Sequence, residues 1–487
     1  MTLTNIEKGN PPLLEVEDFA LSFRVYKRGL REQSMQVIRK LNMTIHEGEV
    51  VAVIGASGSG KSLLADAILG ILPENTLCAG KLYYKGEVLS GDRQKQLRGK
   101  EISLIPQSVS ALNPLMKTGK QVQTAVQYGD SKTLQRAIFQ KISLPEEADN
   151  HYPFELSGGM ARRVLTATAI IGDPDLIIAD EPTPGLDPTS LQEVTGYIRE
   201  LADDGKGVMF ITHDIETALK AADRVVIMNE GKTIETAIAE DFTGKGEGLR
   251  KSYTKALWNA LPQNEFVPIN ESSHKEVIKD HRKLKVNGLK YRYSDAPYLF
   301  KNLNLYVSPG EVVGLFGYSG AGKTTLAQII AGYLKPDAGT VEIDGNTVSH
   351  SDAHPVQLIW QHPEKAVNPR WRMRQILSEG GPLDRELLND LGIKNEWLDR
   401  YPSELSGGEL QRFCLARALG SKTKYLIADE MTTMLDAITQ AQIWHAVLQL
   451  VKQRNIGILA ISHDQHLLQR VSDRMINFDE FARSYEC

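Results

Sequence analysis

One set of motifs occurs twice in this chain, in the same order both times. Each set has an apolar run ending at glycine, a Leu-Ser-Gly-Gly tetrapeptide, an apolar run ending in Asp-Glu, and one ending in His-Asp. Corresponding motifs lie roughly 250 to 260 residues apart, far more than one solenoid repeat, so the chain is predicted to hold two domains of one fold. The pairs are Glu49–Gly55 with Glu311–Gly317, Leu156–Gly159 with Leu405–Gly408, Ile178–Glu181 with Ile427–Glu430, and Ile211–Asp214 with Ile461–Asp464.

Each copy alternates short β-branched runs with helical stretches such as Leu191–Asp203 and Thr439–Gln453, which is the pattern of a parallel α/β fold. The length of 487 residues allows two such domains, each with its own core. The stretch from Gln263 to Lys283 is polar and lacks periodicity, which is typical of a linker. We therefore predict a first domain at residues 1–262, a linker at 263–283 and a second domain at 284–487.

The composition argues against several kinds of protein. A net charge of −5 gives no overall basic surface for coating nucleic acid, so no nucleic-acid partner is expected. Cys78, Cys414 and Cys487 form no C-x-x-C pair, which argues against a disulfide framework or a zinc site and favours a reducing compartment. Residues 1–10 do not resemble a secretory signal, and no run approaches the roughly 18 apolar residues that span a bilayer. If the protein works at a membrane, other chains must supply the spanning helices.

Two glycine-rich loops carry the chemistry of phosphate binding. Gly55–Ser62 and Gly317–Thr324 match the P-loop pattern, and each follows an apolar strand and precedes a helical stretch. The glycines let backbone N–H groups approach phosphate, and the helix N-terminus adds its positive end. ATP and Mg²⁺ are the predicted cofactors, with Lys61 and Lys323 on the β- and γ-phosphates and Ser62 and Thr324 on Mg²⁺. The remaining phosphate-binding residues are Gly55, Ser57, Gly58 and Gly60 in the first loop, and Gly317, Ser319, Gly320 and Gly322 in the second.

Two acidic pairs and two histidines follow the loops at strand ends. Asp180 and Asp429 would hold the hydrated metal ion, and the neighbouring Glu181 and Glu430 would polarise the attacking water. An apolar run that ends in Asp-Glu is commonly just a strand meeting a polar loop, but the nearby P-loop favours the catalytic interpretation. A lone histidine at a strand end is usually structural. Its recurrence in both copies favours a role for each imidazole as a donor to the γ-phosphate. These histidines are His213 and His463.

With these motifs in this order twice, the chain resembles the ATP-binding cassette ATPases over nearly all its length. The resemblance implies ATP hydrolysis by two tandem P-loop domains. Each would have a mainly parallel sheet, an antiparallel β subdomain and a helical subdomain. It also implies that the Leu-Ser-Gly-Gly signature loop of one domain completes the nucleotide site of the other, so that the two domains act as an ATPase dimer within the chain. One site would join Lys61, Ser62, Gln107, Asp180, Glu181 and His213 with Ser406, Gly407, Gly408 and Asp436. The other would join Lys323, Thr324, Gln361, Asp429, Glu430 and His463 with Ser157, Gly158, Gly159 and Asp187.

The family's other binding residues have matches here. Gln107 and Gln361 correspond to the glutamine that contacts Mg²⁺ and signals to the membrane subunits. Phe23 and Tyr293 correspond to the aromatic that stacks on adenine, although an apolar strand residue is the alternative reading of both. The signature loops depart from the pattern, because Met160 and Glu409 replace the usual fifth-position glutamine and Arg162 stands where Gln411 keeps the usual residue. We expect both sites to remain competent, since serine and glycine backbones supply the phosphate contacts.

Further motifs resemble the peptide and nickel importers, whose two ATPase subunits are here fused. They are Ala111–Pro114, Ala366–Pro369 and Ser252–Leu257, with Pro262 following. Two stretches of the second half slightly favour the nickel or metal-chelate importers within this family. They are Asp429–Asp436 and Leu405–Arg412. No cysteine lies between Cys78 and Cys414, which excludes there the iron–sulfur cluster that many peptide-importing relatives carry. The resemblance implies two transmembrane permease subunits, an extracytoplasmic solute-binding protein acting indirectly, and a peripheral position on the cytoplasmic face of the membrane.

Two other kinds of cassette protein remain as alternatives. A soluble tandem ATPase acting on ribosomes usually has a long charged helical linker, whereas Gln263–Lys283 is short and mixed. A DNA-repair ATPase would carry zinc-ligand cysteines or a long inserted coiled coil, and neither pattern is present. Fold alone does not decide among these functions. The transported solute is not encoded in any motif of this chain.

Overall fold

The computed structural model describes residues 11–26, 32–56, 58–183, 188–266, 283–294, 297–317, 320–347 and 354–479. The chain divides into two compact units, Met1–Lys255 and Ala256–Cys487. The division lies within helix α8 (Ser252–Asn259), a few residues before the predicted end of the first domain. Residues 267–282 of the predicted linker lie outside the described residues, so the boundaries at 262 and 283 stay predictions.

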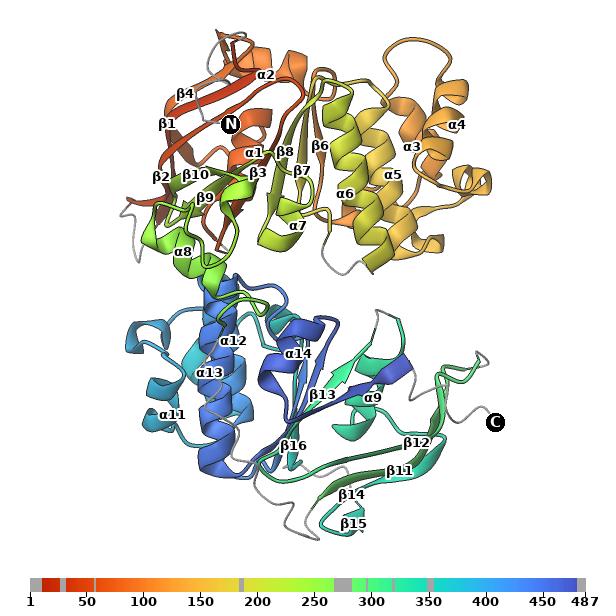
Figure 1. The fold of residues 1–487 in the computed structure, drawn as a ribbon, viewed down its shortest axis with the longest axis vertical. Helices are drawn as coiled ribbons and strands as arrows, with labels where there is room; N and C mark the ends of the chain where they lie inside the picture. Colours follow the sequence, from red (N-terminus) through yellow and green to blue (C-terminus); the bar gives the residue numbers. More distant parts are fainter. Residues whose placement is uncertain are drawn as a thin grey trace. The chain divides into compact units, whose positions relative to one another are not determined.

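The described strands of the first unit form one sheet, in the order β5-β4-β1-β2-β10-β9-β3-β8-β7-β6 (Figure 1). The run β9-β3-β8-β7-β6 is parallel throughout. The run β5-β4-β1-β2 is antiparallel, and β10 joins the two runs, antiparallel to β9 and parallel to β2. The strands are β1 (Leu14–Tyr26), β2 (Glu32–Ile45), β3 (Val50–Gly55), β4 (Thr76–Tyr84), β5 (Glu87–Val88), β6 (Ile102–Ile105), β7 (Leu176–Asp180), β8 (Gly207–Thr212), β9 (Arg224–Asn229) and β10 (Lys232–Ile238). Besides α8, the helices are α1 (Lys61–Leu69), α2 (Gly91–Leu97), α3 (Thr118–Thr124), α4 (Ser131–Lys141), α5 (Gly158–Ile170), α6 (Pro188–Asp203) and α7 (Ile215–Leu219).

The described strands of the second unit form two sheets, an antiparallel one ordered β12-β11-β14-β15 and a parallel one ordered β16-β17-β18-β13-β19. The strands are β11 (Leu284–Tyr291), β12 (Phe300–Val307), β13 (Val312–Phe316), β14 (Ala338–Ile343), β15 (Asn346–Thr347), β16 (Val356–Ile359), β17 (Tyr425–Asp429), β18 (Gly457–Ser462) and β19 (Arg474–Asn477). The helices are α9 (Lys323–Ile330), α10 (Met373–Ser378), α11 (Arg385–Asp390), α12 (Gly407–Ala418), α13 (Ala437–Arg454) and α14 (Gln465–Val471).

Both units place a helical subdomain between two neighbouring parallel strands. In the first unit α3, α4 and α5 lie between β6 and β7 in the chain, and in Figure 1 they stand together beside the sheet. In the second unit α10, α11 and α12 lie between β16 and β17. The central strands are buried along their length because helices cover both faces of the sheet, which explains their continuous apolar runs. The prediction of tandem domains with a parallel core, an antiparallel subdomain and a helical subdomain is confirmed.

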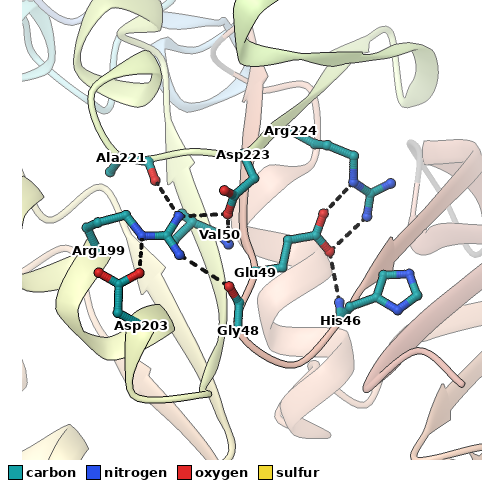
Figure 2. A network of polar contacts seen from close by, with 9 residues as sticks. All are labelled: His46, Gly48, Glu49, Val50, Arg199, Asp203, Ala221, Asp223 and Arg224. Atoms are coloured by element: carbon teal, nitrogen blue, oxygen red, sulfur yellow. Dashed lines mark hydrogen bonds and ion pairs between the residues drawn. The ribbon is translucent and has the colours of Figure 1, made fainter. Parts of the chain in front are cut away.

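A buried ion pair joins the starts of β3 and β9 in the first unit (Figure 2). Arg224 donates from both Nε and Nη2 to the carboxylate of Glu49, the Nη2 contact being 3.0 Å. The same carboxylate accepts the backbone N–H of His46 at 2.9 Å, and Asp223 accepts the backbone N–H of Val50 at 2.8 Å. Glu49 is buried, and with its bonds to the arginine and the turn it fixes where β3 begins.

The second unit repeats this arrangement at the start of β13. Arg474 donates to Glu311, which also accepts the backbone N–H of Ser308 at 2.7 Å. Asp473 accepts the backbone N–H of Val312 at 2.8 Å. The repeat in the sequence therefore extends to a structural ion pair that the comparison of motifs did not reveal.

Candidate functional site

The P-loop of the first unit follows β3 and leads into α1. Gly58 and Gly60 have φ angles of 80° and 98°, which side chains with a Cβ rarely adopt. At Gly55 a Cβ would lie 2.4 Å from the carbonyl oxygen of Met228, so this position tolerates only glycine. Lys61 is buried and its Nζ donates to the carbonyl of Gly55 at 2.7 Å. The backbone thus forms the tight loop that the motif predicts.

The second unit builds the same loop between β13 and α9. Gly320 and Gly322 have φ angles of 84° and 103°, and the buried Lys323 donates from Nζ to the carbonyl of Gly317 at 2.7 Å. Burial lowers the pKa of Lys323, which the nearby carboxylates partly offset. Ser57 and Ser319, predicted to bind phosphate, lie outside the described residues.

An oxygen-rich pair stands beside each P-loop. Ser62 Oγ donates to Asp180 Oδ1 at 3.2 Å, and a hydrogen bond joins Thr324 to Asp429. Both aspartates end buried strands, and burial raises the pKa of each to about 6, with the neighbouring glutamate adding to the shift. Hydroxyl and carboxylate oxygens are the hard ligands that Mg²⁺ prefers, so the residues present fit this ion.

Each glutamate of the acidic pairs is bonded to a histidine. His213 Nδ1 lies 3.1 Å from Glu181 Oε2, and His463 Nδ1 lies 3.1 Å from Glu430 Oε1. Burial raises the pKa of each carboxyl, but the bond to the histidine and its charge outweigh burial and hold the glutamate pKa below its usual value. The same contacts raise the pKa of both histidines. The pairs therefore keep the carboxylates ionised.

The backbone directs these glutamates. Glu181 and Glu430 have φ angles of 44° and 49°, in the left-handed region that is strained for residues other than glycine. Their N–H groups bond to the carbonyls of Ile211 at 2.9 Å and Ile461 at 3.0 Å, on the adjacent strand. This bond holds the strained residue at the strand end, so the preceding aspartate and the glutamate present their side chains at one edge.

The two glutamines differ between the units. Gln361 Nε2 donates to Glu430 Oε2 at 2.8 Å, so both carboxylate oxygens of Glu430 accept hydrogen bonds. Gln107 is exposed, and within the part of the chain that the structure describes its side chain makes no hydrogen bond. It lines a small pocket together with Arg162 and Pro182. The motif predicted both glutamines alike, but among the described residues only that of the second unit contacts the glutamate of its acidic pair.

The signature loops form the N-termini of long helices. Ser157 caps α5 and Ser406 caps α12, each accepting the backbone N–H of the third following residue. No hydrogen bond joins either serine to the P-loop of its own unit among the described residues. Pairing of each signature loop with the other domain's P-loop stays a prediction. The glycines next to the serines are Gly158, Gly159, Gly407 and Gly408.

Asp436 is buried and caps α13, accepting the backbone N–H of Thr439 at 3.1 Å and its hydroxyl at 2.7 Å. In this structure it therefore serves the helix. Its predicted counterpart Asp187 lies outside the described residues.

The two predicted adenine-stacking aromatics are placed differently. Tyr293 is 50% exposed, and its hydroxyl lies 3.0 Å from Thr325 Oγ1 at the start of α9. Phe23 is half-buried in β1 and packs against the apolar core. The Tyr293 ring packs edge to face against Tyr291, with the ring centroids 5.1 Å apart. The packing of Phe23 is what its alternative interpretation as a strand residue predicts.

The Asn-Pro motifs have the same local structure in both units. Asn113 Oδ1 accepts the backbone N–H of Leu115 at 2.9 Å, and Asn368 Oδ1 accepts that of Arg370 at 3.0 Å. Both are turns in which an asparagine side chain bonds two residues ahead. The motif is thus explained by turn geometry in each copy.

Two P-loops, each with an oxygen pair and a glutamate–histidine pair at the end of a parallel sheet, define a P-loop ATPase with two cassettes. The family model described as ABC transporter matches residues 38–184 and 300–433, and the chain belongs to this family. It is 30% identical to the "Uncharacterized ABC transporter ATP-binding protein YejF" of Escherichia coli, over 95% of this chain and 93% of that protein. It is also 30% identical to the "Glutathione import ATP-binding protein GsiA" of Salmonella typhimurium, over 91% of this chain and 82% of that protein. A solved chain from the "Model of ribosome-bound archaeal Pelota and ABCE1" has a TM-score of 0.62 over 94% of this chain and 76% of its own length. At 22% identity it shows the fold alone.

Metal binding at these sites is expected to weaken in acid. Because the pKa of Asp180 and of Asp429 is about 6, protons compete for both carboxylates as the pH falls through that value. Apparent Mg²⁺ affinity for the nucleotide-bound protein should fall about tenfold between pH 7.5 and pH 5. Calorimetric titration at several pH values measures this. The double variant Asp180→Asn, Asp429→Asn controls for titration of the nucleotide itself, and an identical pH profile in that variant would contradict the assignment.

Proposed function

We propose that this chain is the ATP-hydrolysing subunit of an importer at the cytoplasmic face of a membrane. The main support for this proposal is the similarity of the chain, over nearly its full length, to relatives that are named for import, such as GsiA. It would work with two permease subunits, and with a solute-binding protein on the other side. No helix among the described residues is long and apolar enough to cross a membrane.

The geometry supports a division of labour within each ATP site. The buried Lys61 and Lys323 would exchange their loop carbonyls for phosphate oxygens. Asp180 with Ser62, and Asp429 with Thr324, would hold Mg²⁺, which neutralises phosphate charge when bound. We propose for the ATP sites also the remaining residues that the P-loop, glutamine, signature-loop and aromatic motifs predict in the sequence analysis.

Glu181 and Glu430 would orient water for in-line attack on the γ-phosphoryl and accept its proton, while His213 and His463 hold the carboxylates and donate to the γ-phosphate. In the second unit Gln361 donates to Glu430 Oε2, which leaves the other lone pair of that oxygen for the attacking water.

We propose peptides or peptide-like molecules as the transported solute. The support is in the relatives' names, since GsiA is named for glutathione and the OppD protein of Mycobacterium tuberculosis, 28% identical over 95% of this chain, for oligopeptide. The slight lean towards nickel in the motifs stays a prediction, and no relative named here carries nickel in its name.

Purification of the tagged full chain from detergent-solubilised membranes tests the importer assignment. Two polytopic membrane proteins are expected to co-purify with the chain, in the same proportion to it in repeated preparations. Co-sedimentation with ribosomes and no membrane partner would instead favour the ribosome-acting ATPase. Uptake of labelled short peptides and of Ni²⁺ should then be compared in a deletion strain complemented with the wild-type gene or with the Lys61→Ala, Lys323→Ala variant. Peptide uptake is expected only with the wild type.

A further inference from the structure

The signature helix α12 carries a buried amide that has no hydrogen-bond partner among the described residues. Gln411 is 1% exposed, and neither its Nε2 donor nor its Oε1 acceptor is bonded there. Leaving a buried amide unpaired costs free energy, which an apolar side chain of similar shape would avoid. The cost disappears in any conformation in which the amide finds a partner. Gln411 therefore favours a conformation in which it is bonded.

The Gln411 side chain lies on the face of α12 that packs against the chain after β17. At Gly408, three residues earlier on the helix, a Cβ would lie 2.6 Å from Thr439 and 3.8 Å from Leu435. Residues three apart share one face of a helix, so Gln411 faces the same stretch of chain. That stretch begins directly after Glu430, the proposed catalytic glutamate.

The first unit shows the bonded form of the same position. Arg162 has the place of Gln411, since each follows the signature serine by five residues. Its Nη1 donates to the carbonyl of Pro182, the residue after Glu181, over a long 3.4 Å. Met431 has the place of Pro182, and among the described residues its carbonyl accepts no hydrogen bond. The second unit therefore holds an unpaired donor and an unpaired acceptor where the first unit has a bond.

The strand end next to Met431 is where MgATP would act. Asp429, which we propose as a ligand of Mg²⁺, ends β17, and Glu430 follows it with a φ angle of 49°. The Met431 carbonyl is therefore only two residues from a metal ligand. Because the donor and the acceptor lie on facing segments, movement of this strand end towards α12 on MgATP binding would bring them together.

We propose that Gln411 Nε2 donates to the Met431 carbonyl when the second unit binds MgATP, so that this bond joins α12 to the backbone beside Glu430. The inference rests on the proposed ATPase function. Gln411 is a positioning residue, because it acts through that backbone and takes no part in the chemical step. In the first unit Arg162 makes the corresponding bond in the conformation described, so we expect that bond to depend less on MgATP.

The variant Gln411→Met tests this proposal, because methionine has a similar shape but no donor. Hydrogen exchange of α12 is followed by mass spectrometry in the full chain with Glu181→Gln and Glu430→Gln, with and without MgATP. Without MgATP the exchange should be as slow as with Gln411, or slower. With MgATP it should be about twofold to tenfold faster than with Gln411, because one bond is missing. The control Leu410→Met, at a buried position of the same helix, should show no such dependence on MgATP.

Two outcomes of the exchange experiment would overturn the proposal. Exchange that is faster in Gln411→Met to the same extent with and without MgATP would mean that the amide is bonded in both conformations, for example to a buried water. Exchange that is unchanged in both conditions would mean that the amide has no partner in either. In the first unit Arg162→Met is expected to speed the exchange of α5 to a similar extent with and without MgATP.

Steady-state hydrolysis separates this role from a purely structural one. In the Glu181→Gln chain, whose working glutamate is Glu430, Gln411→Met is expected to raise the KM for MgATP about twofold to tenfold with kcat little changed. In the Glu430→Gln chain the KM should not change. A KM raised equally in both chains, or in neither, contradicts the proposal. A wild-type chain without ATP turnover would refute the proposed function itself, whereas normal turnover without an effect of Gln411→Met refutes only this inference.

Discussion

The double variant Glu181→Gln, Glu430→Gln is expected to hydrolyse MgATP at least about 100-fold more slowly than the wild-type chain. Both carboxylates are held ionised by a histidine 3.1 Å away, at strand ends beside the P-loops. Glutamine keeps the shape but cannot accept the proton of the attacking water. Phosphate release in a steady-state assay measures the loss. Nucleotide binding should persist, because the lysines and the Mg²⁺ ligands are untouched.

Single variants then report on each site. Glu181→Gln and Glu430→Gln should each lower turnover, because both units have the same glutamate–histidine geometry. A single change without effect would show that its site is degenerate. If the double variant kept most of its turnover, these glutamates would not be the catalytic bases.

The second large effect is expected on stability. Replacing Arg224 by methionine leaves the carboxylate of Glu49, buried at the start of β3, without its guanidinium partner (Figure 2). Loss of one partner of a buried pair lowers the free energy of unfolding by about 3 to 5 kcal/mol. Hydrogen exchange of peptides from β3 and β9, followed by mass spectrometry, measures this in the first unit, while exchange in β13 should not change.

The neighbouring arginine is a matched control. Arg199 also bonds to Asp203 at 3.0 Å and Asp223 at 2.8 Å, but both of these carboxylates are exposed, unlike that of Glu49. Arg199→Met is therefore expected to lower the free energy of unfolding by no more than about 1 kcal/mol. Adding Glu49→Met to Arg224→Met should restore part of the stability, because the unpaired charge is removed. Equal losses for the two arginine variants would contradict the assigned burial.

The structure of the local motifs can be predicted from the sequence, because it depends on only a few neighbouring residues. The P-loop needs glycines at left-handed positions followed by a helix start, and Gly60 and Gly322 occupy such positions. The capping box of α12 was equally readable, since Ser406-Gly-Gly-Glu409 is the serine-x-x-glutamate pattern of such caps. The same glutamate is the residue that departs from the family motif at the fifth signature position.

Contacts between segments that are distant in the chain cannot be predicted from the sequence in this way. Arg224 pairs with Glu49 across 175 residues, and no spacing rule links them. The only hint was the recurrence of Asp-Arg at 223–224 and 473–474. Gln107 and Gln361 occupy the same motif position, yet only Gln361 bonds to its glutamate. Phe23 and Tyr293 likewise share a place in the motif, but one ring is packed and the other is half exposed.

The sequence alone therefore determined that this chain is a two-cassette ATPase, because phosphate binding and helix capping depend on short-range backbone geometry that residue type dictates. Only the tertiary structure decided how alike the two cassettes are. The state of each glutamine, the exposure of each aromatic ring and the ion pairs at the strand starts depend on which distant side chains fill the space around them. That packing is a property of the whole fold.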